Sequence, residues 1–267
     1  IQNVGDDELL DMGIEPDSFA YARFLAEARL SLARTAKPEG VALADRVLES
    51  ASKSLRLRVL PIAVDLYLAA GETEKASRAV ESYREGLQAS VNVTTADTHQ
   101  LALLSAGVAE VQGKYYEVIR LLEPLTMPKP DNPQVWRLLW RAYDRTNQDG
   151  RARNALQEYV ARQPGDSAAA MTLASSYRNI DWNRAVQFAT RAEQVAPDSP
   201  EAKLLRIEGQ LRSGTSRLSD TQAQQIAKDL ASLQQASPKR VSVRILKAML
   251  DVRQGNRADA EAELEKA

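Results

Sequence analysis

The pattern of apolar and polar positions along this chain predicts a fold made of helices. Apolar residues recur at spacings of three and four, and the alternating apolar and polar runs that mark strands are missing. The clearest segment is 132–166, where a turn separates two apolar stripes, formed by Trp136, Leu139, Trp140 and Tyr143 and then by Ala152, Leu156 and Tyr159. Such a helical hairpin cannot bury its apolar faces alone, so it predicts neighbours packed on both sides.

Related hairpins recur at a nearly constant period. Val118 and Ala152 are 34 residues apart, Ala152 and Ala185 are 33 apart, and Pro130 and Pro164 are 34 apart. A chance run of helices would not keep this phase. We therefore predict an all-α solenoid of about seven hairpins in a single array over residues 17–267, with hairpins at about 17–54, 57–90, 97–130, 133–164, 167–197, 200–238 and 241–267.

Local signals predict how some of these helices begin and which face they bury. Asp17 or Ser18 is expected to cap the first helix, and Asp97 is expected to cap the helix that follows the connector 91–97. In the seventh hairpin, the apolar stripe that we expect to match the one at Trp136 consists of Ile245, Ala248, Met249 and Val252.

The two ends of the chain predict an arm and a longer protein. The segment 1–16 carries five acidic residues and no basic one, so we interpret it as a solvated acidic arm or a short cap. The sequence begins at Ile1 without a methionine and stops at Ala267 within a helical pattern. We therefore expect the chain to be truncated from a longer protein, with flanking domains or anchors outside it.

Composition narrows the classes of function. Hydrophobic residues make up 44% of the 267 residues and charged residues 27%, which is typical of a soluble, well-packed chain. The net charge of −1 gives no general attraction to nucleic acid, and no apolar run approaches the ~20 residues that a membrane span needs. The chain has no cysteine, which excludes disulfides and thiolate metal sites but leaves both the cytoplasm and the periplasm open as its compartment.

No catalytic pattern is present. His99 is the single histidine and follows a predicted helix start, where we expect it to face solvent. There is no G-x-S-x-G elbow, no phosphate-binding G-x-x-x-x-G-K-[ST] and no G-x-G-x-x-G motif. We expect no enzyme activity, no cofactor and no metal in this segment.

The hairpins resemble the tetratricopeptide repeat, whose signature is W-x2-L-G-x2-Y, then A-x3-F, then P, over about 34 residues. Two successive units match it, at Trp136, Leu139, Tyr143, Ala152, Leu156 and Pro164 and at Ala170, Leu173, Ala174, Tyr177, Ala185 and Pro197. Trp140 departs from the pattern, because the family prefers a small residue there. The resemblance implies a right-handed superhelix.

In the resembled family, the first helices of successive hairpins line a concave groove that holds peptide ligands. Carried over to this chain, the lining includes Leu103 in the third hairpin, Gln134, Arg137, Arg141 and Arg145 in the fourth, and Met171, Arg178 and Asn179 in the fifth. The arginines of the fourth hairpin recur every four residues and share one stripe, where they can bind a carboxylate or phosphate. The alternative is a solvated face, with the arginines paired to Asp144 or Glu110.

The resemblance implies a non-catalytic scaffold for protein–protein interaction within a larger bacterial protein or assembly. The expected partner is a protein or peptide, of acidic character if the arginine stripe binds it. One alternative is a self-assembling scaffold, in which another copy of the chain fills the groove. The other alternative is the recruiting arm of an enzyme whose catalytic domain lies outside these residues. Nucleic acid is not an expected partner, since acids such as Asp65 and Glu110 fall on the same lining.

Overall fold

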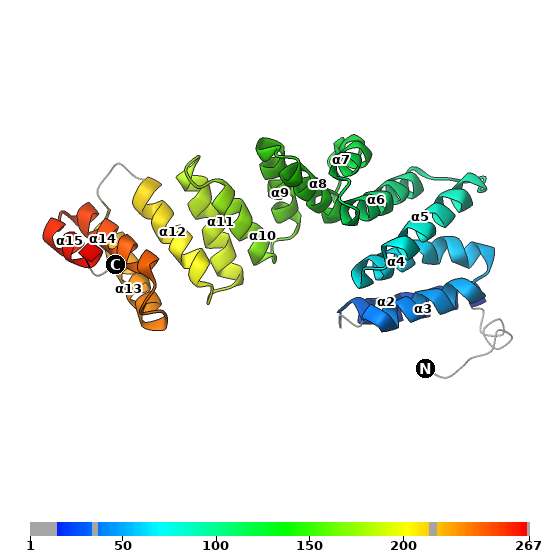
Figure 1. Ribbon diagram of the computed structural model, residues 1–267, viewed down its shortest axis with the longest axis horizontal. Helices are drawn as coiled ribbons and strands as arrows, with labels where there is room; N and C mark the ends of the chain where they lie inside the picture. The colour runs from blue at the N-terminus through cyan, green and yellow to red at the C-terminus, as the bar shows by residue number, and fades with distance from the viewer. Residues whose placement is uncertain (1–14, 34–36, 214–217, 266–267) are drawn as a thin grey trace. The chain divides into compact units, whose positions relative to one another are not determined.

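The structure is a computed structural model that describes residues 15–33, 37–213 and 218–265. Within these ranges the chain holds fourteen α-helices, one 3₁₀-helix and no strand (Figure 1), which confirms the predicted all-α class. The elements are α2 (Pro16–Ala33), α3 (Lys37–Ser50), α4 (Lys53–Ala70), α5 (Thr73–Gln88), α6 (Thr95–Val111), α7 (Tyr115–Leu122), η1 (Glu123–Thr126), α8 (Pro133–Arg145), α9 (Asp149–Arg162), α10 (Ser167–Ser176), α11 (Trp182–Val195), α12 (Pro200–Ser213), α13 (Asp220–Ala236), α14 (Val241–Gln254) and α15 (Arg257–Glu265).

The predicted acidic arm at 1–16 lies almost entirely outside the described residues, which begin at residue 15.

The chain divides into two compact units, Ile1–Ala152 and Arg153–Ala267, and each has its own apolar core. In the first unit, Phe24, Val59 and Val64 are among the most deeply buried side chains. In the second unit, Ile207 and Ile226 are likewise among the most deeply buried side chains. Each core is filled from consecutive helices, as expected for repeats that stack on their neighbours.

Within each unit, the first helices of successive hairpins pack against one another as well as against their partners. In the first unit, α4 contacts α6 and α6 contacts α8; in the second unit, α10 contacts α12 and α12 contacts α14. This packing is that of a helical solenoid. It creates one face per unit that is lined by first helices alone, and these two faces carry the candidate binding residues.

Residues with positive φ end several of the first helices. Gly71 and Gly255 follow α4 and α14 with φ of 81° and 92°, a conformation that glycine adopts without strain. Asn147 and Asn179 adopt φ of 56° and 66° after α8 and α10. The turn predicted between the two apolar stripes of 132–166 is therefore present, and it passes through Asn147 between α8 and α9.

The predicted cap of α6 was wrong. Thr94, and not Asp97, is the N-cap residue: its Oγ1 accepts a hydrogen bond from the Asp97 backbone N–H at 3.2 Å. Asp97 Oδ2 accepts in return from the Thr94 backbone N–H at 2.9 Å, which completes a capping box. The hydrogen bonds from Thr94 hold the pKa of Asp97 below its ordinary value. The acid thus occupies the third helical position, three residues after the true cap.

The predicted cap of α2 was also wrong, because the helix begins earlier, at Pro16. Proline suits the first helical position, where its missing N–H costs no hydrogen bond. Asp17 instead accepts hydrogen bonds from the hydroxyls of Ser52 and Ser54, both at 2.6 Å, and these bonds lower its pKa. Asp17 therefore ties the start of α2 to the start of α4.

The predicted apolar stripe of α14 was placed one residue out of phase. The residues that α14 buries are Val243, Leu246, Ala248 and Leu250. Of the predicted stripe only Ala248 is among them, and the side chains of Ile245 and Val252 remain 42% and 57% exposed. The segment carries apolar residues in both phases, so its periodicity alone does not select the buried face.

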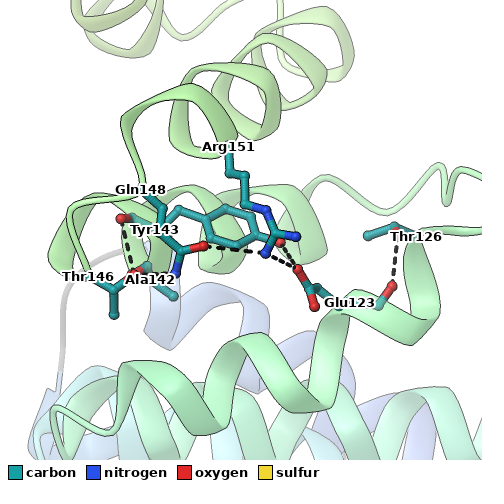
Figure 2. A network of polar contacts seen from close by, with 7 residues as sticks. All are labelled: Glu123, Thr126, Ala142, Tyr143, Thr146, Gln148 and Arg151. Carbon is teal, nitrogen blue, oxygen red and sulfur yellow. Dashed lines mark hydrogen bonds and ion pairs between the residues drawn. The ribbon is translucent and has the colours of Figure 1, made fainter.

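A cluster of three polar side chains links the consecutive segments η1, α8 and α9 (Figure 2). Tyr143 Oη donates to Glu123 Oε1 at 2.7 Å, and Arg151 Nη1 donates to the same oxygen at 2.7 Å. The Arg151 guanidinium lies 5.5 Å from the centre of the Tyr143 ring. Burial, followed by the contact with Glu123, raises the pKa of the Tyr143 phenol above its ordinary value. The contacts fix the fourth hairpin against the third.

The same arrangement recurs two hairpins earlier, around Tyr67 of α4. Tyr67 Oη donates to Asp45 Oδ1 at 2.7 Å, and Lys75 Nζ donates to Asp45 Oδ2 at 2.5 Å while lying 5.7 Å from the Tyr67 ring centre. In both cases the carboxylate comes from the preceding hairpin, and the cation follows its tyrosine by eight residues. The tyrosine of the repeat pattern therefore serves as a polar link between hairpins as well as a core residue.

Candidate functional site

Two of the three predicted arginines of the first unit, Arg137 and Arg141, lie on the face formed by α4, α6 and α8. Arg137 and Arg141 are one helical turn apart on α8, and both lie beside Glu110 of α6. Arg141 Nη1 is 3.0 Å from Glu110 Oε1, and Arg137 Nη2 is 4.0 Å from Glu110 Oε2. We call Arg137, Arg141 and Glu110 the first arginine triad. The pairing with Glu110 is the one that the solvated-face alternative anticipated.

Within this triad, one carboxylate serves two guanidinium groups. The side chain of Glu110 is 12% exposed, whereas that of Arg141 is half exposed. Gln134 Oε1 accepts a hydrogen bond from Arg137 Nε at 2.6 Å, so it orients Arg137 on the same helix. A guanidinium has five N–H donors, and one shared carboxylate does not use them all. Because it consists of two guanidinium groups and one carboxylate, the first arginine triad carries one net positive charge.

Asp65 of α4 lies on the same face. Its side chain keeps exposed surface, yet the surrounding protein limits its hydration. This desolvation raises the pKa of Asp65 to about 6, and the nearby Arg137 guanidinium opposes the rise. When Asp65 is ionised, Asp65 and the first arginine triad together have two carboxylates and two guanidinium groups, and their charges sum to zero.

The other predicted residues of the first unit are placed differently. Leu103 is half-buried on α6. Arg145 is exposed at the end of α8, where it lines a separate hollow of about 410 Å³ together with Lys114 and Tyr116. The structure therefore brings Arg137 and Arg141 together and places Arg145 beside the turn.

The second unit has a groove along α10, α12 and α14, with a volume of about 510 Å³. Its lining is Met171, Ser175, Arg178, Glu201, Leu204, Leu205, Glu208, Arg212, Arg240, Ser242, Ile245, Leu246 and Met249, and we call it the α10–α12–α14 groove. Of the predicted site residues, Met171 and Arg178 line it. Asn179 does not, because it turns the chain after α10.

The floor of the α10–α12–α14 groove is apolar. Met171, Leu204 and Met249 contribute from three different helices, together with Ile245, which is still 42% exposed. The sequence prediction missed the α14 residues because it placed Ile245 and Met249 in the core. One signal in the sequence could have placed Ile245 and Met249 on the groove. They are four residues apart, which is also the spacing of Arg137 and Arg141, the residues predicted to line the groove on α8.

Charged side chains border this floor as ion pairs. Glu208 accepts hydrogen bonds from Arg178 Nη2 and, at 3.1 Å, from Arg212 Nε. We call these three residues the second arginine triad. Elsewhere on the lining, Arg240 Nη2 donates to Glu201 Oε1 at 3.0 Å, and this hydrogen bond lowers the pKa of Glu201. The border thus contains three arginines and two carboxylates.

His99 is exposed near the start of α6, as predicted. In the described ranges, no group of three or more histidine, cysteine, aspartate or glutamate side chains is arranged to hold a metal ion. None of the described helices combines the length and hydrophobicity needed to cross a bilayer.

Comparisons with known proteins concern both the repeat and the fold. Residues 111–175 match a family model described as a tetratricopeptide repeat. Among solved structures, PilF of Pseudomonas aeruginosa shares 14% identity, with 88% of this chain and 99% of PilF covered, at a TM-score of 0.58. The apo form of RapI shares 11% identity, with 92% of this chain and 75% of RapI covered, at a TM-score of 0.52. No curated protein sequence matches the chain.

Proposed function

The chain belongs to the tetratricopeptide repeat superfamily, and on that premise we propose that its α10–α12–α14 groove binds an apolar segment of a partner protein. Repeats of this family generally form scaffolds for protein–protein interaction and are typically non-catalytic. The proposal assigns this general role to one surface. In this role the groove binds its partner through complementary shape and burial of apolar surface, without a chemical reaction.

The observation that supports the proposal is the exposed apolar floor of the groove. Ile245 is a large aliphatic residue on a first helix, yet solvent reaches 42% of it. Contiguous apolar surface that is bordered by polar residues is typical of interaction sites. The volume of about 510 Å³ lies within the range of about 300–1,000 Å³ that is usual for ligand-binding clefts. The helices are already packed, so binding would order little of the scaffold.

The face of the first unit provides a second contact in this proposal. The first arginine triad, with Gln134 and Leu103 nearby on α8 and α6, would contact acidic side chains of the same or another partner. Support comes from the two guanidinium groups of Arg137 and Arg141 that share Glu110. The double substitution Arg137→Ala and Arg141→Ala tests this contact: unchanged affinity for acidic peptides would remove it from the proposal.

A hydrogen-exchange footprint tests the assignment of the groove. Random 16-residue peptides are selected by display against the full chain, and the best binder is added at saturation before exchange. We expect slower exchange in α10, α12 and α14, since these helices line the groove. Protection confined to α3, α5 or α13, with no change in the three groove helices, would contradict the proposal.

A further inference from the structure

The charges that border the α10–α12–α14 groove are not balanced, and the imbalance has a definite place. The lining contains the positive groups of Arg178, Arg212 and Arg240 and the negative groups of Glu201 and Glu208. Arg240 and Glu201 pair one to one at 3.0 Å. The excess positive charge therefore belongs to the second arginine triad, where Arg178 and Arg212 share the single carboxylate of Glu208.

The geometry of this triad leaves donors available to a ligand. The side chain of Glu208 is 13% exposed, and its two oxygens are each taken by one arginine. Arg178 and Arg212 are about half exposed, and each guanidinium offers more N–H groups than the bond to Glu208 uses. The Arg212 guanidinium also lies 5.5 Å from the centre of the Trp182 ring, which restricts its position. The cationic groups are thus held in place beside the apolar floor.

We propose that the partner of this groove is an amphipathic segment of another protein that carries a glutamate or aspartate beside its apolar side chains. The apolar side chains would cover Met171, Leu204 and Ile245. The carboxylate would accept hydrogen bonds from Arg178 and Arg212 and so neutralise the second arginine triad. This inference rests on the proposed function and adds the chemical class of the partner.

Charge complementarity favours a side-chain carboxylate over a phosphate group. The second arginine triad has one net positive charge, which one carboxylate balances. A phosphate group, with a charge near −2 at neutral pH, would leave about one negative charge uncompensated beside Glu208 and Glu201. The apolar floor also requires side chains that a free anion does not have. The ligand class is therefore an acidic and apolar peptide.

The test uses two labelled peptides and the full chain. The acidic probe is a 14-residue amphipathic helical peptide, blocked at both termini, with leucines spaced by three and four residues and two glutamates beside them. The neutral probe has glutamine in place of both glutamates. Blocking the termini removes the free carboxylate as a source of binding. Affinities are measured by fluorescence anisotropy at low and at high salt.

We expect the acidic probe to bind about tenfold more tightly than the neutral probe at low salt, because charged hydrogen bonds are stronger than neutral ones. The advantage should shrink at high salt. In the double variant Arg178→Gln and Arg212→Gln, the acidic probe should fall to the affinity of the neutral probe, which itself should not change. Arg257→Gln, on the exposed start of α15, is the matched control and should leave both affinities unchanged.

The outcomes separate the two proposals. Equal affinity of both probes for the unmodified chain overturns the inference about charge but leaves the groove proposal standing. Retention of the acidic preference in the double arginine variant also overturns the inference. Absence of binding by either probe counts against both. A synthetic peptide of residues 5–15, which is acidic and apolar, is the final arm: tighter binding than the acidic probe would assign the groove to another copy of this chain instead.

Discussion

Tyr143 donates its hydroxyl hydrogen to Glu123 of the preceding hairpin at 2.7 Å, and Arg151 holds the same carboxylate oxygen from the following helix (Figure 2). The contact joins α8 to the end of the third hairpin at a place where Tyr143 is buried and Glu123 is half-buried, while Arg151 remains exposed. Tyr67 and Asp45 repeat it. A residue of the repeat pattern that counts as apolar core thus also sets the spacing of neighbouring hairpins through one hydrogen bond.

Removal of this hydroxyl should destabilise the first unit. Tyr143→Phe keeps the ring but deletes the donor, and we expect the free energy of unfolding to fall by about 0.5–1.5 kcal/mol. Urea denaturation followed by circular dichroism measures the change. Tyr116→Phe is the matched control, because Tyr116 is 73% exposed and its substitution should change stability by less than about 0.5 kcal/mol. Equal effects of the two substitutions would show that the bond to Glu123 contributes nothing.

The capping box of α6 supports a second prediction. Thr94→Ala removes the oxygen that accepts from the Asp97 backbone N–H, and we expect a loss of about 1 kcal/mol in the free energy of unfolding. Thr95→Ala, at the next position, keeps the cap and serves as the control. If the Thr95 variant loses as much stability as the Thr94 variant, the capping role assigned to Thr94 is wrong.

Asp65 gives a prediction about pH. Its folded pKa of about 6 lies above its ordinary value of 3.8, so the ionised form is the less favourable one in the folded state. The contribution of Asp65 to the free energy of unfolding should therefore rise as pH falls from 7 through 6 toward 4. Asp65→Asn should abolish this part of the pH dependence, as seen by urea denaturation at pH 7, 6, 5 and 4.

The comparison with the Asn variant isolates Asp65 from other carboxylates. Asp17, Asp45 and Asp97 have lowered pKa values, so their stabilising contributions are present above pH 3.8 and are lost only as pH falls below it. A difference between the two proteins that is constant from pH 7 to pH 4 would contradict the raised pKa of Asp65.

Close packing of α11 against α12 gives a fourth prediction. A Cβ atom at Gly209 would lie 2.4 Å from Val186 Cγ2, so Gly209→Ala should cost about 1–3 kcal/mol of stability through overpacking. Gly150→Ala is the control, because a Cβ there has no neighbour within 4 Å and α9 gains a better helix former. It should raise stability by up to about 1 kcal/mol. Val186→Ala should partly restore the Gly209 variant, and failure to do so would place the clash elsewhere.

The sequence predicted the fold class because the repeat phase is a local property. Trp136, Leu139 and Tyr143 lie on one helix face whatever surrounds them, and the 34-residue period then implies stacked neighbours. The buried face of α14 could not be predicted in the same way. Both of its phases contain apolar residues, and the choice is made by the residues of α12 and α13 that pack against Val243 and Leu246.

The candidate site was predictable only in part for a similar reason. The spacing of Arg137 and Arg141 identifies a stripe, but only the packing of α6 against α8 shows that both share Glu110. The groove of the second unit combines residues from three helices that are far apart in sequence. Ile245 belongs to it because of the phase of α14, which the local pattern left undecided.

One affinity measurement tests the central claim that the α10–α12–α14 groove binds the partner. The peptide selected by display is titrated calorimetrically against the unmodified chain, Ile245→Glu and Ile180→Glu. Both isoleucines are exposed, but only Ile245 lines the groove. We predict that Ile245→Glu weakens binding at least tenfold, through loss of an apolar contact and burial of a charge, while Ile180→Glu leaves the affinity unchanged. Equal affinities of the two variants would contradict the claim.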